Sequence, residues 1–316
     1  MTKHIKKSVL EKSILAAALF FLIGCSAGTL FFSGLANDLT SHSRNTSRGS
    51  AEAASTSPEK LYVRNKDKQT LSSIALLTSA PGLLRDGDGN RMNFQLIPGL
   101  GVGTSTPSSE KVVYLTFDDG PSVNTQAVLD VLDKYNAKAT FFVTGINTQY
   151  AALIKTAADK GHTIGLHTMC HDYATIYASE DAYFKDLERI GNLVSDQIGY
   201  IPCFVRFPGG SSNTISARFS YGIMTKLSTD VITKGYQYYD WNADCEDGSG
   251  TLTPDQLYSR AIKYSSNNIV LLCHDASGKE TTVQALPEII EHFQSEGYVF
   301  RGIDRESYAP HHSINN

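Results

Sequence analysis

The sequence is poor in several features that would assign a protein to a common class. It has a single tryptophan, five cysteines and a formal net charge of −4. No Cys-x-x-Cys pair occurs, so neither a zinc ribbon nor a disulfide framework is indicated. Nucleic-acid binders carry a basic surface that this composition does not supply, so we expect no nucleic-acid partner. The 316 residues suffice for one sizeable core, and no internal repeat is visible.

The long uncharged run of the sequence lies near its N-terminus. Residues 14–36 carry no charged side chain and follow a basic segment, residues 1–13, that contains four lysines. A helix of that length crosses a hydrocarbon core of about 30 Å. The lysines predict a cytoplasmic N-terminus and an extracellular remainder, so we expect a single-pass signal anchor in the cell membrane. The sequence LIGC at 22–25 resembles a bacterial lipobox, which leaves a lipoprotein anchor at Cys25 as the alternative.

Composition divides the rest of the chain. Residues 37–60 are rich in Ser, Thr, Asn and Ala, and they predict a flexible linker. Turn signals and a possible short strand at 92–97 indicate a small N-terminal arm or cap over 61–108. We expect the catalytic domain at 109–305, a C-terminal tail at 306–316 and a monomeric protein.

From Lys111 onward, short apolar stretches typical of strands alternate with amphipathic stretches typical of helices. This repeated βα pattern predicts parallel strands with helices outside them, as a barrel or a doubly wound sheet. Chemistry in such folds gathers at the carboxyl ends of the strands. Several polar or aromatic side chains follow predicted strands: Asp118, Asp119, His167, Arg206, Asp240, Trp241 and His274.

Five short motifs carry a family resemblance. In chain order they are TFDDGP at 116–121, HTMCH at 167–171, RFPGG at 206–210, DW at 240–241 and LLCHD at 271–275. Together they resemble the polysaccharide deacetylases of the NodB-homology type. The resemblance implies a distorted (β/α) barrel that removes N- or O-acetyl groups with a divalent metal ion. We expect zinc, with cobalt, nickel and manganese as alternatives.

The residues suit such a metal site. Adjacent carboxylates at Asp118 and Asp119 repel each other, and they need a cation or a proton to be buried. His167 and His171 are four residues apart, and with one carboxylate they would form a two-His, one-Asp metal site. By resemblance Asp119 is the third ligand, and Asp118 is the general base. His162 points to the opposite face of its strand, and we expect it to be structural.

The remaining catalytic assignments also follow the resemblance. His274 is the candidate general acid, which needs an imidazole whose pKa is held up. The family pattern assigns Asp240 to that tuning and places Arg206 beside Asp118.

Four residues are candidates for substrate binding. The period of two in a strand puts Leu272 on the face of His274, so we expect it to line the acetyl pocket. By analogy with the family, Gly209 supplies a backbone N–H for the oxyanion. The segment differs here from the commoner Arg-Pro-Pro-Tyr-Gly form, so we expect a different groove wall. Trp241 and Tyr239 offer aromatic faces for sugar rings.

A tethered domain of this kind predicts a hydrolase of N-acetylglucosamine residues in a cell-surface polysaccharide, with the peptidoglycan glycan strand as the expected substrate. A chitin-type or exopolysaccharide deacetylase and an acetylxylan esterase are the alternative enzymes. A catalytically inactive carbohydrate-binding protein is the alternative of another class.

Overall fold

The computed structural model describes residues 93–100, 102–248 and 250–316. The predicted anchor at 14–36, the alternative anchor at Cys25, the linker at 37–60 and most of the arm at 61–108 lie outside these ranges. Within them, no helix has both the length and the apolar character that a membrane crossing requires. The described residues therefore comprise the predicted catalytic domain, the end of the arm and the C-terminal tail.

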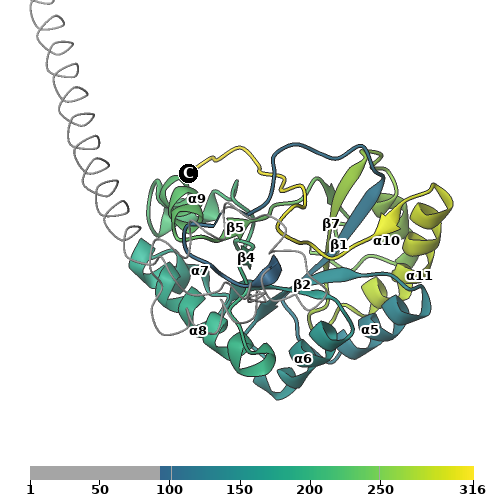
Figure 1. The fold of residues 1–316 in the computed structure, drawn as a ribbon, viewed down its shortest axis with the longest axis horizontal. Helices are drawn as coiled ribbons and strands as arrows, with labels where there is room; N and C mark the ends of the chain where they lie inside the picture. The colour runs from purple at the N-terminus through teal and green to yellow at the C-terminus, as the bar shows by residue number, and fades with distance from the viewer. Residues whose placement is uncertain (1–92, 101, 249) are drawn as a thin grey trace, which may run out of the picture. The chain divides into compact units, whose positions relative to one another are not determined.

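One curled parallel sheet forms the centre of the domain (Figure 1). Its order is β5-β4-β3-β2-β1-β7-β6, and β8 pairs with the start of β1. Every ladder is parallel. The strands are β1 (Val112–Asp118), β2 (Ala139–Thr144), β3 (Thr163–Thr168), β4 (Phe204–Val205), β5 (Gln237–Tyr238), β6 (Ala243–Asp244), β7 (Asn268–His274) and β8 (Val299–Phe300). The predicted parallel α/β architecture is confirmed. Since no ladder among the described residues joins β5 to β6, the sheet is a half-barrel and not a closed barrel.

Helices cover the outer face of this sheet (Figure 1). They are α5 (Thr125–Lys134), α6 (Ala152–Asp159), α7 (Tyr173–Ile176), α8 (Glu180–Ile198), α9 (Ile223–Thr233), α10 (Pro254–Ala261) and α11 (Glu280–Ser295), with 3₁₀ turns η2 (Thr148–Tyr150) and η3 (Ile215–Arg218). Local signals set the helix ends. Ser179 caps α8 by accepting from Ala182 N, and Thr253 forms a capping box with Gln256 at the start of α10.

The core has two parts, one on each face of the sheet. Val113, Leu115 and Phe117 of β1 are fully buried in the layer between strands and helices. Val112 and Tyr114 point the other way, into a smaller cluster inside the half-barrel. This period of two is expected of a strand buried on both faces. It explains why the strands are largely apolar, with the charged and imidazole side chains of β1, β3 and β7 at or near their carboxyl ends.

Both flanks of the domain pack against the sheet. In the described part of the arm, Gln95 forms an isolated antiparallel bridge with Pro202, and Thr104 forms a parallel bridge with Tyr308. The C-terminal tail continues past β5, where the backbone N–H of Asp240 donates to Pro310 O at 3.0 Å. The tail therefore lies against the open edge of the half-barrel.

Candidate active site

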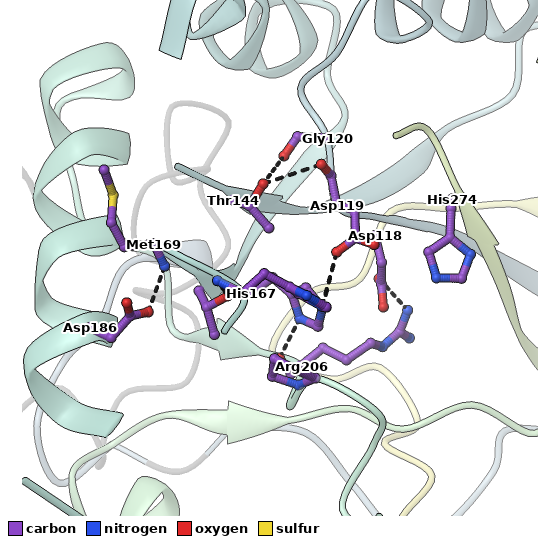
Figure 2. Close-up of polar contacts among 12 residues, drawn as sticks. Asp118, Asp119, Gly120, Thr144, His167, Met169, Asp186, Arg206 and His274 are labelled. Carbon is purple, nitrogen blue, oxygen red and sulfur yellow. Dashed lines mark hydrogen bonds and ion pairs between the residues drawn. The ribbon is translucent and has the colours of Figure 1, made fainter. Parts of the chain in front are cut away.

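The two aspartates lie where β1 ends, between His167 and His274 (Figure 2). In the register of β1 with β7, Asp118 is directly opposite His274. The backbone then turns at Asp119, which has a φ of 71°. Gly120 allows a close approach here, because a Cβ at this position would lie 2.3 Å from the Asp275 carboxylate. The turn therefore aims the two carboxylates in different directions.

Asp119, His167 and His171 converge as a candidate metal site. Asp119 Oδ1 lies 3.5 Å from His167 Nε2 and 3.3 Å from His171 Nε2. This oxygen is buried and has no hydrogen-bond partner among the described residues. Since a carbonyl only accepts, His167 Nδ1 donates to Arg206 O at 2.6 Å, which leaves the Nε2 lone pair facing Asp119.

The charge state of this group also fits a divalent cation. Burial lowers the pKa of His167, against the opposing effect of Asp118 and Asp119, so the imidazole is neutral at pH 7. Two imidazoles and a carboxylate form a donor set that suits zinc and similar ions. A cation here would satisfy the orphaned Asp119 oxygen, so the residues present fit the metal that the sequence predicts.

Asp118 has a different cation. Its Oδ1 accepts from Arg206 Nη1 at 2.9 Å, and both side chains are buried. The guanidinium is fixed on every side: it also donates to Thr116 Oγ1 and to the backbone oxygens of Tyr239 and Asp240. The predicted pairing of Arg206 with Asp118 is present. The adjacent aspartates are thus tolerated because one faces a guanidinium and the other faces the candidate metal site.

His274 is oriented by Asp247, and the assignment of this task to Asp240 was wrong. His274 Nδ1 donates to Asp247 Oδ1 at 2.7 Å, and Asp247 Oδ2 accepts from His274 N and Thr282 Oγ1. Burial alone would lower the pKa of His274, but the hydrogen bond and charge of Asp247 outweigh it and, with Asp118 and Asp119, raise the pKa to about 9. The imidazole is therefore protonated at neutral pH, as a general acid must be.

Asp240 belongs to the other edge of the sheet. Its carboxylate accepts from Ser211 N at 2.7 Å, Ser211 Oγ at 2.5 Å and His312 N at 2.7 Å. It follows β5, whereas His274 ends β7, whose neighbour is β6. Asp247 lies three residues after the end of β6, so it is the carboxylate within reach. Its signal in the sequence was the acidic stretch DCEDG after a short strand.

The structure places the four predicted substrate-binding residues in different surroundings. Tyr239 was wrongly placed, because it is fully buried inside the half-barrel with its ring edge on Phe204. Trp241 is half-buried and packs edge-on against His312 at 4.8 Å. Leu272 is buried, opposite Asp244 on β6. Gly209 is exposed, with a φ of 77°.

The peptide before Gly209 is held in one orientation by a residue that the sequence did not suggest. Pro208 O accepts from the buried Tyr177 hydroxyl at 2.8 Å. The C=O and N–H of a trans peptide point in opposite directions. The Gly209 N–H therefore points away from Tyr177, and it donates no backbone hydrogen bond within the described ranges.

Asp275 is a second residue without a predicted role. It is fully buried under the turn at Gly120, and burial raises its pKa to about 7. Its Oδ2 accepts from Thr125 Oγ1 at 2.5 Å. This contact ties the turn after β1 to the end of β7. In the sequence, only its position in the LLCHD motif next to His274 pointed to Asp275.

Comparison with known proteins agrees with this geometry. The family model described as polysaccharide deacetylase matches residues 105–222. A peptidoglycan-N-acetylglucosamine deacetylase of Bacillus cereus is 31% identical over 209 residues, which are 63% of this chain and 72% of that protein. A bifunctional xylanase/deacetylase of Pseudobutyrivibrio xylanivorans is 30% identical over 63% of this chain and 30% of its own length.

A solved structure extends the likeness to the fold. The catalytic domain of a peptidoglycan N-acetylglucosamine deacetylase from Eubacterium rectale has 43% sequence identity and a TM-score of 0.65, covering 67% of this chain and 97% of that one. The turn with two aspartates, the paired histidines and the buried arginine lie on a half-barrel of the same type. The chain belongs to the polysaccharide deacetylase family of hydrolases.

Proposed function

We propose that the protein removes N-acetyl groups from N-acetylglucosamine residues of peptidoglycan, using a divalent ion held by Asp119, His167 and His171. The observation that carries the proposal is the buried, unpartnered Asp119 oxygen within 3.5 Å of two imidazole nitrogens. The neighbouring Asp118 lies opposite His274 in the strand register. The names of the Bacillus cereus and Eubacterium rectale relatives support the choice of substrate.

The chain's own residues divide the reaction between them. A divalent ion, when bound, would lower the pKa of a water and polarise the acetyl carbonyl. Asp118, held by Arg206, accepts the proton of the attacking water. The Gly209 N–H, directed by Tyr177 through Pro208, donates to the oxygen that becomes negative. His274, protonated and oriented by Asp247, gives its proton to the leaving amine, and acetate and a free amine result.

The test is acetate release by the full-length protein in mild detergent. Peptidoglycan and N-acetylglucosamine oligomers should be deacetylated, a chelator should stop the reaction, and zinc should restore it. Acetylated xylan serves as the competing substrate. Release from acetylated xylan alone would replace the proposed substrate, and activity that survives complete metal removal would overturn the proposed metal.

We further propose that the domain is extracellular and tethered to the cell membrane. The support is the uncharged run at 14–36 behind the lysines of residues 1–13. Protease added to intact cells should remove the domain. Metabolic labelling with a fatty acid distinguishes the two anchors, because a lipoprotein would carry label that Cys25→Ser abolishes, whereas a spanning helix would carry none.

A further inference from the structure

Tyr173 stands at the edge of the candidate active site, two residues after His171. It is the first residue of α7, a short helix capped by Asp172, which accepts from the backbone N–H groups of Ala174 and Thr175. Its half-buried ring packs edge-on between His171, at 6.0 Å, and Tyr177, at 5.4 Å. Aromatic packing of this kind fixes the direction of a ring. The hydroxyl therefore has one defined position.

That position is the space next to Gly209. A Cβ built on Gly209 would lie 2.5 Å from the Tyr173 hydroxyl oxygen and 3.5 Å from Cζ of the same ring. Carbon and oxygen atoms cannot approach to 2.5 Å without a bond. Together with the φ of 77°, this contact requires glycine at position 209. Tyr173 thus fills, from a different loop, the room that a side chain at 209 would take.

The Tyr173 hydroxyl is available to a ligand. It forms no hydrogen bond with another described residue, and its oxygen is not fully buried. Tyr177, the neighbouring tyrosine, differs in this respect, since its hydroxyl is used by Pro208 O. An accessible hydroxyl on a fixed ring, between a candidate metal ligand and an exposed N–H, is suited to bind a polar group of a substrate.

We propose that Tyr173 forms the wall of the substrate groove beside Gly209 and donates a hydrogen bond from its hydroxyl to the acetylated sugar. This inference rests on the proposed function, because it names a further residue that contacts the same substrate. It also supplies the wall that Gly209 itself, without a side chain, does not provide.

Tyr173→Phe removes the hydroxyl and keeps the ring. On a soluble N-acetylglucosamine oligomer we expect kcat/KM of the full-length protein to fall about tenfold, the value of one good hydrogen bond to substrate. Bound metal and Tm should stay unchanged. The matched control is Tyr135→Phe, at the far end of α5, where the hydroxyl contacts the surface side chains of Glu291 and Lys134. It should leave kcat/KM as it was.

Two outcomes would overturn the role of Tyr173. An unchanged kcat/KM in Tyr173→Phe would show that the hydroxyl does not touch the substrate. A loss of activity accompanied by loss of metal would show that the residue acts only by supporting His171. Failure of the proposed function is distinguishable from both, since the unmodified protein would then release no acetate from the oligomer.

A double-variant cycle tests the shared space directly. Gly209→Ala should reduce activity strongly, since its methyl group meets the Tyr173 hydroxyl. In a Tyr173→Phe background the nearest atoms would be Asn213 Cβ at 3.1 Å and the ring at 3.5 Å, so the further loss should be smaller. Backbone strain at 209 is the same in both backgrounds and cancels. Strictly additive losses would contradict the proposed packing.

Discussion

The hydrogen bond between Asp247 and His274 couples the protonation of one imidazole to one carboxylate. In Asp247→Asn the carboxylate charge that raises the pKa of His274 is lost, while the burial that lowers this pKa remains. Because the acid must be protonated, activity disappears as pH rises through this pKa. The basic limb of kcat/KM against pH should therefore move to lower pH by one unit or more. A cation at Asp119 would lower the pKa of His274, so the basic limb of the unmodified protein would lie below pH 9. Asp247→Asn would still move that limb to lower pH.

Asp240→Asn is the control for that experiment. Its carboxylate contacts Ser211 and His312, so this variant should lose stability while its basic limb stays in place. A limb that moves in Asp240→Asn and stays in Asp247→Asn would restore the assignment made from the sequence.

The two adjacent aspartates should respond differently to the same substitution. Asp119→Asn replaces an anionic candidate ligand by a neutral amide, so elemental analysis should show metal loss. Asp118→Asn should keep the metal and lower kcat by a factor of about 10² or more, because the proposed general base is removed. It also leaves Arg206 buried without its anionic partner, which should lower Tm. Metal loss in Asp118→Asn alone would reverse the two roles.

At the scale of elements, the C-terminal tail packs against the open edge of the half-barrel and stabilises it. His312 N donates to Asp240, and Asn316 O accepts from Thr225 N at the start of α9. Removing residues 311–316 breaks these contacts and the stacking of His311 on Tyr238 at 3.9 Å. A cost of about 3 kcal/mol, near 1 kcal/mol for each contact, should lower Tm by roughly 10 °C.

Activity should fall with the truncation, because Asp240 O also accepts from Arg206, the partner of Asp118. Ser313→Ala, at an exposed tail position, should behave as the unmodified protein and serves as the control. If calorimetry shows the same Tm with and without the six residues, the tail does not contribute to the domain.

For the whole molecule, His162 makes folding sensitive to acid. It lies at the amino-terminal end of β3, where Nδ1 accepts from Ala139 N at 3.2 Å, and burial lowers its pKa to about 4. The unfolded value is near 6.5, so the folded state favours the neutral ring. Its contribution to the free energy of unfolding is complete above pH 6.5 and is lost as the pH falls through 4. The total loss is about 3 kcal/mol.

Urea unfolding of metal-free protein at pH 7, 5.5 and 4 measures this effect. His162→Asn keeps an acceptor for Ala139 N but cannot be protonated, so its free energy of unfolding should depend less on pH. Parallel losses in both proteins across this range would assign the acid sensitivity to other groups.

Much of the fold could be predicted from the sequence because its signals are local. Residues close in sequence determine the apolar strand runs, the amphipathic helices and the helix caps. The carboxyl ends of parallel strands lie at the same edge of a sheet. This is why Asp118, His167 and His274 could be expected together. The sequence did not indicate α9, whose apolar residues are separated by Ser and Thr. The aromatic stretch 234–242 is typical of a longer strand, but only Gln237–Tyr238 pairs.

Tertiary structure decided which side chains meet across the rim. The motif pattern in the sequence led to Asp240 and not to Asp247, because strand order is not readable from the chain. The pairing of β6 with β7 brings Asp247 to His274, and the position of β5 at the other edge sends Asp240 to the tail. Likewise Tyr239 is buried and Tyr173 faces Gly209, because these contacts depend on how loops distant in sequence pack.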